Sequence, residues 1–367
     1  MSLRPRPEIE KVQAASHGGP VQAELMALGL TPETVLDFSV CSNPYPPPRG
    51  VREILATVPI NYYPDSEATE LRQCLAGALA VPPDNILVGA GVIEIIRLVT
   101  LTYIKPGDNI LILEPTFGEY RVACQIAGAG IKSLWGREEE QFTPGVEEVV
   151  DSIKRYRPIA VFMCNPNNPT GNYLTRQQVE IVLDACADSL LILDEAYINF
   201  VEEGWSVFDL VERGNVVILR SMTKDYALAG LRLGYAVAAS DIIQVLRKVR
   251  PPWNVSTVAQ KAGVAALRDT DYLERCKKDI NGAKRFLTDG LTALGFYLLP
   301  SSTNFFLVKV ADSGAFRRAL LRRGILVRDC TSFGLPGYVR LAPRTLPECE
   351  QLMAAIKALK QEGEIQG

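Results

Sequence analysis

The chain has 367 residues, of which 47% are hydrophobic and 22% charged, and its formal net charge is −3. The length suits about two or three domains, and the composition is that of a globular protein. The nearly balanced charge gives no reason to expect nucleic acid or an anionic membrane as a partner. No apolar run of the sequence reaches the length that a membrane-spanning helix needs.

Eight cysteines are present, but none shows the C-x-x-C spacing of a metal site, and His17 is the single histidine. This pattern argues against zinc, and we expect no metal. No signal peptide precedes Arg4-Pro5-Arg6, so we expect a cytoplasmic protein whose thiols stay reduced.

Residues 1–40 are expected to form an N-terminal arm. The arm contains His17-Gly18-Gly19 and a short helical pattern over 21–28, and it ends in a short strand over 35–39. The run Asn43-Pro44-Tyr45-Pro46-Pro47-Pro48 then predicts a rigid extended connection, because proline has a fixed φ and no amide donor.

Residues 41–245 are expected to form a large domain in which strands alternate with helices. The predicted strands are 85–88, 109–113, 159–164, 190–193, 216–219 and 231–239. The predicted helices are 68–79, 92–101, one that opens at 116–120, 146–155 and 175–186. This alternation predicts an α/β fold with a mainly parallel sheet that is flanked by helices on both faces.

Residues 246–367 are expected to form a smaller C-terminal α+β domain. Two helical patterns over 256–268 and 272–294 come first, after a helix over 241–249 that runs up to Arg250-Pro251-Pro252. The remaining predicted strands are 296–299, 304–310, 325–328 and 338–342, and the remaining predicted helices are 314–323 and 347–360.

Two ionisable side chains follow buried strands of the large domain. Lys224 comes after the strand 216–219, and Asp194 stands at the end of the strand 190–193. Open α/β sheets bind ligands at the carboxyl ends of their strands. A partly desolvated lysine can form a Schiff base, and a lysine with a carboxylate for a pyridinium nitrogen is the pair that pyridoxal phosphate (PLP) requires. Taken singly, Lys224 also fits a surface lysine and Asp194 a helix cap.

Further groups suited to an aromatic ring follow the same strand ends. Tyr197 and Asn168 could donate to a ring oxygen, and Phe117 could stack on a ring. Ser221 and Arg232 could hold a phosphate near Lys224.

The turn Gly89-Ala90-Gly91 leads from a strand into a helix N-terminus, where free N–H groups and the helix dipole favour an anion. It lacks the third glycine of a dinucleotide fingerprint, and no acidic ribose partner is evident. A nicotinamide-dependent dehydrogenase is therefore disfavoured.

As a set, these motifs resemble the fold type I PLP enzymes of aminotransferase class I/II over essentially the whole chain. The motifs are Ser221-x-x-Lys224 with Arg232, Asp194-x-x-Tyr197 and Asn168-Pro169-Thr170-Gly171. Within that superfamily the chain is similar to the histidinol-phosphate aminotransferase branch, and closer still to the L-threonine-O-3-phosphate decarboxylases of cobalamin biosynthesis. The segments that carry this closer likeness are His17-Gly18-Gly19, Asp37-Phe38-Ser39, Pro115 to Tyr120, Arg220 to Lys224, Val327 to Cys330 and Arg340 to Arg344.

The resemblance implies a role for each matching residue at the cofactor. Lys224, Asp194 and Tyr197 would be the catalytic residues: Lys224 would hold PLP covalently and move protons, and Asp194 would keep the ring nitrogen protonated. Tyr197 and Asn168 would bond the ring oxygen, and Phe117 would stack on the ring. The cofactor phosphate would be bound by Ser221, Arg232 and the backbone of Gly91, Val92 and Ile93.

The resemblance also implies partners. Tyr63 would reach the cofactor phosphate from the partner subunit, which implies a homodimer with shared active sites. Arg340 would bind the carboxylate of a small acidic or phosphorylated amino-acid substrate, and Arg328, Asn43 and His17 would serve its other acidic end.

The chain departs from the related branch at Pro20, Val92, Ile93 and Asp225, and these departures bear on substrate identity. The reaction depends on which bond at the α-carbon is held perpendicular to the ring. The motifs favour decarboxylation of L-threonine O-3-phosphate, and the alternative is transamination of histidinol phosphate or a related amino acid. A regulator that has lost activity is disfavoured, because such a protein need not keep the catalytic set.

Overall fold

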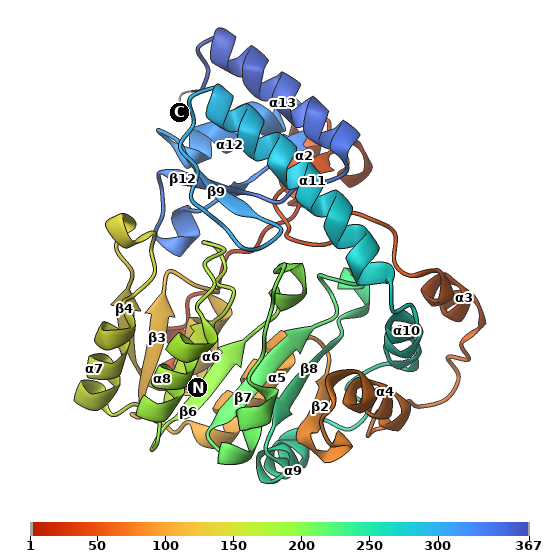
Figure 1. Ribbon diagram of the computed structural model, residues 1–367, viewed down its shortest axis with the longest axis vertical. Helices are drawn as coiled ribbons and strands as arrows, with labels where there is room; N and C mark the ends of the chain where they lie inside the picture. The colour runs from red at the N-terminus through yellow and green to blue at the C-terminus, as the bar shows by residue number, and fades with distance from the viewer. Residues whose placement is uncertain (1–2, 366–367) are drawn as a thin grey trace.

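The computed structural model describes residues 3–365, so the outermost two residues of the predicted arm and of the predicted small domain lie outside the described residues. Figure 1 shows a broad sheet with its helices in the lower part of the molecule and a smaller group of helices and short strands above it. The predicted α/β fold is confirmed.

The large sheet has seven strands in the order β2-β8-β7-β6-β5-β3-β4. β8 pairs antiparallel with β2 and with β7, and the remaining neighbours are parallel. The central strands are apolar and buried on both faces, which is the pattern of a parallel sheet covered by helices. The strands are β2 Ile86–Gly89, β3 Asn109–Glu114, β4 Gly130–Trp135, β5 Ala160–Cys164, β6 Leu190–Asp194, β7 Val216–Ser221 and β8 Gly234–Ala238.

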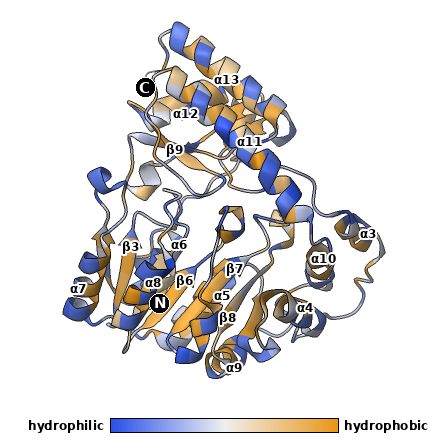
Figure 2. Cartoon of the chain, in the orientation of Figure 1, coloured by the Kyte–Doolittle hydropathy of each residue, from blue (hydrophilic) through white to orange (hydrophobic). Residues whose placement is uncertain are grey.

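Two hydrophobic cores cover the two faces of this sheet. Figure 2 shows hydrophobic strands at the centre and helices that carry hydrophilic residues on their outer sides. One core is formed with α4 Thr69–Leu79, α7 Val146–Tyr156, α8 Arg176–Ala185 and α10 Thr257–Arg268. The other is formed with α5 Val92–Tyr103, α6 Glu119–Ile126 and α9 Ser240–Val249.

The smaller part is built on a three-stranded antiparallel sheet in the order β11-β12-β9. Its strands are β9 Phe306–Lys309, β11 Arg328–Asp329 and β12 Tyr338–Leu341, and its helices are α11 Tyr272–Ala293, α12 Ser313–Leu321 and α13 Leu346–Gln361. The end of the predicted arm joins this part: β1 Leu36–Asp37 pairs in parallel with β10 Ile325–Leu326, and Phe38 is buried in the same core. The arm itself holds α1 Pro7–Glu10 and α2 Gln22–Ala27.

Several features differ from the elements that the sequence predicts. Helix α3 Arg49–Thr57 directly follows the proline run, and β4 forms an edge of the large sheet; neither was predicted. Helix α10 packs against α3 and α4 in the core of the large sheet, beyond residue 245. The predicted strand over 296–299 is reduced to a single bridge between Leu298 and Val308.

Within residues 3–365, no helix combines the length and hydrophobicity needed to cross a bilayer, and no cluster of potential metal ligands is found. All eight cysteines are free thiols, and seven of them are buried.

Candidate active site

A cavity of about 340 Å³ opens where strands of the large sheet end. Ten of the residues singled out from the sequence line it, together with Cys164, Ala196 and Thr223. Those ten are His17, Val92, Ile93, Phe117, Asn168, Asp194, Tyr197, Ser221, Lys224 and Arg232. The predicted groups therefore share one cavity, although they come from segments far apart in the chain.

Lys224 follows β7 in the loop that begins after Ser221. Its backbone oxygen accepts a hydrogen bond from the backbone N–H of Asn43 at 2.7 Å, which fixes the loop against the segment after β1. Burial lowers the pKa of the Lys224 amine, and the positive charges of Arg340 and Arg232 lower it further. A lysine in this environment is more readily neutral and nucleophilic than a solvated one.

Asp194 ends β6 and is 4% exposed. Its Oδ2 accepts a hydrogen bond from the hydroxyl of Tyr120 at 2.6 Å, and its Oδ1 accepts one from the backbone N–H of Ala196 at 2.9 Å. Burial raises the pKa of the carboxyl group, while these two hydrogen bonds and the charge of Lys224 oppose the rise. The carboxylate is thus held in one orientation, at the edge of the cavity.

Tyr120 orients Asp194, and the sequence reasoning did not assign it a role. It lies on α6 three residues after Phe117, and the two rings meet edge to face with centroids 5.6 Å apart. The available signal was an aromatic residue in the first turn of a helix that directly follows a strand end, where ligands of open α/β sheets bind.

The two groups suited to a ring oxygen also lie at the cavity. Tyr197 packs edge-on against Phe305, with ring centroids 4.9 Å apart, and burial raises the pKa of its hydroxyl well above the usual value. Asn168 accepts a hydrogen bond from Nη1 of Arg340 through its side-chain oxygen. A single asparagine therefore joins the cavity to the arginine behind it.

The turn into α5 has the geometry of an anion cradle. Gly91 caps the helix with φ of +81°, and a Cβ there would lie 3.0 Å from Nη2 of Arg232. A Cβ on Gly234 would lie 2.9 Å from the backbone nitrogen of Val92, so β8 approaches the turn closely only because that residue is glycine. The N–H groups of Val92 and Ile93 stand in the first turn, where no helical acceptor exists.

Hydroxyl groups complete this cradle. Ser221 Oγ lies 2.6 Å from Oγ1 of Thr223, and both side chains line the cavity with Arg232. Thr223 is a further residue that the sequence reasoning left without a role, although it stands next to Lys224. The guanidinium, hydroxyls and backbone N–H groups form a donor set for a phosphate.

Two arginines face each other beside the cavity, because Arg328 of β11 is paired with Arg340 of β12. Nη2 of Arg340 donates to the backbone oxygen of Ser39 at 2.9 Å, and Arg328 donates to the backbone oxygens of Ser16 and His17, each at 2.8 Å. In both arginines Nε is buried and has no hydrogen-bond partner within the described chain. The two Nε–H groups are therefore donors that the described chain leaves unsatisfied.

Arg328 lines a second cavity of about 420 Å³, which shares His17 with the first. His17 Nε2 lies 3.0 Å from Oε1 of Glu119, and the other oxygen of Glu119 accepts a hydrogen bond from Arg97 at 2.9 Å. His17 therefore stands where the two cavities meet, held by a carboxylate of α6.

Asn43 and Tyr63 lie away from the cavity. Asn43 is buried, and its Nδ2 donates to the backbone oxygen of Asp225 at 2.9 Å and to the hydroxyl of Tyr272 at 3.1 Å. Tyr63 is 78% exposed and stacks on Trp253, with ring centroids 4.4 Å apart.

A buried lysine with a lowered pKa, an oriented buried acid and a phosphate cradle, all at one edge of a mainly parallel sheet, define a fold type I PLP enzyme. The residues present fit that cofactor, because a lysine for its aldehyde, a carboxylate for its ring nitrogen and free donors for its phosphate line one cavity.

Comparison with known proteins specifies the family. The sequence profile of aminotransferase class I and II matches residues 33–356, and the chain belongs to this family of PLP-dependent enzymes. A histidinol-phosphate aminotransferase of Thermoanaerobacter sp. is 36% identical over 315 residues, which are 85% of this chain and 88% of that protein.

Two solved structures illustrate the likeness. The histidinol-phosphate aminotransferase of Sinorhizobium meliloti in complex with pyridoxal-5'-phosphate superposes with a TM-score of 0.86 over 98% of this chain and 99% of that one, at 23% identity. The L-threonine-O-3-phosphate decarboxylase of Porphyromonas gingivalis superposes with a TM-score of 0.77 over 89% of this chain and 100% of that one, at 26% identity.

Proposed function

We propose that this protein transfers an amino group between a phosphate-bearing amino compound of the histidinol phosphate type and a 2-oxo acid. The observation that carries the proposal is the opposed pair Arg328 and Arg340, each with a buried Nε that lacks a partner in the described chain. Two guanidinium groups match the double charge of a phosphate ester. The curated relatives, named as histidinol-phosphate aminotransferases, support transamination better than the decarboxylation that the motifs favour.

When bound, PLP supplies an electron sink for negative charge at the α-carbon of the substrate. In the proposal, Lys224 would hold the cofactor, and its free amine would accept the proton that leaves the α-carbon of the substrate. Its lowered pKa suits this work, since a neutral amine is needed to accept a proton. Asp194, oriented by Tyr120, keeps the ring nitrogen protonated.

The remaining roles follow from position. Tyr197 and Asn168 would bond the ring oxygen of the cofactor, and Phe117 would stack on its ring. The phosphate would be bound by Ser221, Thr223, Arg232 and the backbone N–H groups of Val92 and Ile93, whereas the predicted N–H of Gly91 already donates to the backbone oxygen of Gly89.

The acidic end of the substrate is proposed to lie between the two cavities, near Arg328 and His17, which line the second cavity. Arg340 lines neither cavity and is connected to the first through Asn168. Asn43 supports this end only indirectly, because its amide nitrogen is already bonded to Asp225 and Tyr272.

A homodimer with shared sites is part of the proposal. Tyr63 belongs to an exposed apolar group on the surface, which also includes Ile60, Tyr62 and Trp253. A second copy covering this group would remove it from water and would bring Tyr63 to the cofactor phosphate of the neighbouring subunit.

Decarboxylation of L-threonine O-3-phosphate, a step of cobalamin biosynthesis, is a second candidate. The observation in its favour is the likeness to the decarboxylase of P. gingivalis, which is fully covered by this chain. Both candidates require a phosphate at the arginine pair, and they differ in the bond that is broken.

The experiment supplies the purified holoenzyme with histidinol phosphate and 2-oxoglutarate in one assay and with L-threonine O-3-phosphate in another. Glutamate formed in the first assay supports transamination, and carbon dioxide with aminopropanol phosphate in the second supports decarboxylation. Turnover of neither compound, with normal cofactor absorbance, would contradict a phosphate-bearing substrate of either type.

A further inference from the structure

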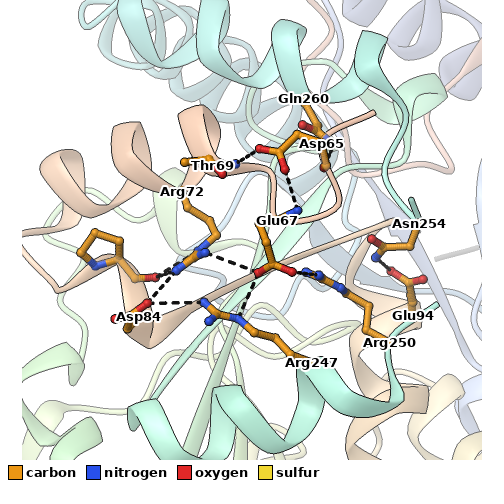
Figure 3. Close-up of polar contacts among 11 residues, drawn as sticks. Asp65, Glu67, Thr69, Arg72, Asp84, Glu94, Arg247, Arg250, Asn254 and Gln260 are labelled. Atoms are coloured by element: carbon orange, nitrogen blue, oxygen red, sulfur yellow. Dashed lines mark hydrogen bonds and ion pairs between the residues drawn. The ribbon is translucent and has the colours of Figure 1, made fainter. Parts of the chain in front are cut away.

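The carboxylate of Glu94 is folded back over the turn that leads into α5. Its Oε2 accepts a hydrogen bond from the backbone N–H of Ala90 at 2.6 Å and another from Nδ2 of Asn254 at 2.6 Å. Figure 3 shows Asn254 pointing at this carboxylate. A Cβ on Gly89 would lie 3.1 Å from the same oxygen, so the glycine leaves space for the carboxylate. The arrangement resembles the backward reach of an N3 glutamate in a capping box.

This contact selects the donors that the turn offers to an anion. Because Ala90 donates to Glu94 and Gly91 donates to the backbone oxygen of Gly89 at 2.8 Å, the N–H groups of Val92 and Ile93 are the ones left for a ligand. A hydrogen bond to a carboxylate is stronger than one between neutral groups, so it restrains the turn effectively. The cradle is therefore held in shape before any phosphate arrives.

Asn254 reaches Glu94 from the connection between α9 and α10, and this connection is itself anchored. Arg250 donates to Glu67 at 2.5 Å, and Trp253 stacks on Tyr63 with ring centroids 4.4 Å apart. Figure 3 shows Arg72, Arg247 and Arg250 converging on Glu67. The connection between α9 and α10 thus positions Asn254 at the turn before α5 and also contacts the loop that carries Tyr63.

We propose that Glu94, aimed by Asn254, is a positioning residue for the cofactor phosphate. It touches no ligand itself, and it acts by fixing the backbone N–H groups of Val92 and Ile93. The inference concerns the cofactor and is independent of the substrate proposed above. It rests on the placement of the phosphate at this turn.

The test compares the binding of pyridoxal phosphate with the binding of pyridoxal, which lacks the phosphate, to dialysed apoenzyme. Glu94→Ala and Asn254→Ala are expected to weaken binding of pyridoxal phosphate about tenfold and to change binding of pyridoxal less than about twofold. Glu94→Gln, which keeps an oxygen acceptor, is expected to lose about threefold or less. Lys261→Ala on α10 removes only an exposed ion pair with Glu70 of α4 and serves as the control.

The thermal midpoint of each apoenzyme is measured alongside, because a merely structural defect lowers it and weakens both ligands together. Equal weakening of both ligands, no weakening of either, or a loss in Glu94→Gln as large as that in Glu94→Ala would overturn the proposal. If Glu94→Ala does not fold, Asn254→Ala tests the same contact from the connecting segment. Failure of this test leaves the substrate assays unaffected, so the two proposals can fail separately.

Discussion

The two ends of the active site are built in different ways. At the cofactor end, Asp194 and Ser221 terminate strands of the large sheet, and Lys224 follows one of them directly. At the other end, called the acidic end because it is proposed to bind the acidic group of the substrate, Arg328 and Arg340 stand on short strands of the smaller sheet. Both arginines donate to backbone oxygens of the N-terminal region, namely those of Ser16, His17 and Ser39. The residues of the cofactor end are thus positioned by one rigid sheet. Those of the acidic end depend on three separate segments, namely the strand of Arg328, the strand of Arg340 and the N-terminal region.

The difference has an energetic consequence. A phosphate that enters the cradle of α5 meets N–H groups that have no acceptor within the helix. An acid group that enters beside Arg328 can use the free Nε, but the terminal nitrogens are already bonded to the backbone of the arm. Binding of an acid group by the terminal nitrogens of Arg328 would therefore replace their hydrogen bonds to the arm. Binding of a phosphate at α5 would give an acceptor to N–H groups that have none.

The largest effect is expected from substitution of Lys224, because the cofactor end depends on this one amine. We expect Lys224→Ala to lower kcat by about three orders of magnitude or more, because both the covalent attachment and the proton transfer are lost. The measurement is the amination rate with saturating amino donor, together with retention of the cofactor after borohydride reduction. Activity above about a hundredth of the parent value would contradict the assignment.

The next effect is expected at the acidic end. Arg340→Ala should lower kcat/KM about a hundredfold. The substitution removes a buried guanidinium that donates to Asn168 and to the backbone of Ser39 and that also carries an unsatisfied Nε–H group. Arg328→Ala should lower it only about tenfold, since its terminal nitrogens serve the arm. Initial rates over a range of substrate concentration decide the order, and a larger loss in Arg328→Ala would reverse the comparison.

The sequence predicts the cofactor end better than the acidic end for a physical reason. Strand ends of a parallel sheet meet at one edge, so Asp194 and Lys224 could be brought together from the alternation of elements alone. The bond from Arg328 to Ser16 joins residues 312 positions apart, and it depends on how the arm folds back. No local pattern reports such a contact.

The missed elements of the fold have similar causes. β4 contains Gly130, Lys132 and Ser133 and is half-buried at an edge, so it lacks the continuous apolar run of the central strands. Helix α3 was missed because it begins directly after three prolines, and a proline run favours extended structure. The chain reversal that brings α10 back to the large sheet also has no local signature.

Substitution of Asn43 tests whether this residue, which the sequence assigned to the substrate, supports the cofactor end instead. Its backbone N–H donates to the carbonyl of Lys224, and its side chain donates to the carbonyl of Asp225. We expect Asn43→Ala to lower kcat about tenfold through a loosened lysine loop and to leave KM for the substrate nearly unchanged. Steady-state kinetics separate the two parameters; a large rise in KM with an unchanged kcat would instead make Asn43 a substrate ligand.

The smallest effect is expected at Asp225, the residue after Lys224, and it concerns the stability of the fold. Burial raises the pKa of this carboxyl group to about 6, against hydrogen bonds from Asn199 at 2.5 Å and from the backbone of Tyr226 at 2.9 Å. Because the folded chain binds this proton more tightly than the unfolded chain, its contribution to stability is fully present below about pH 4. The contribution is lost as the pH rises to about 6.

Asp225→Asn removes the ionisation while keeping an acceptor for Tyr226, and Asn199 can turn its amide to match. The variant should therefore gain stability relative to the parent between about pH 4 and pH 7, by at most about 3 kcal/mol or a few degrees in Tm. Thermal unfolding of the apoenzymes across this range provides the measurement, with the exposed Asp289→Asn as a control. A difference that does not change with pH would mean that Asp225 is ionised throughout, and that the loop next to Lys224 holds a buried negative charge even in acid.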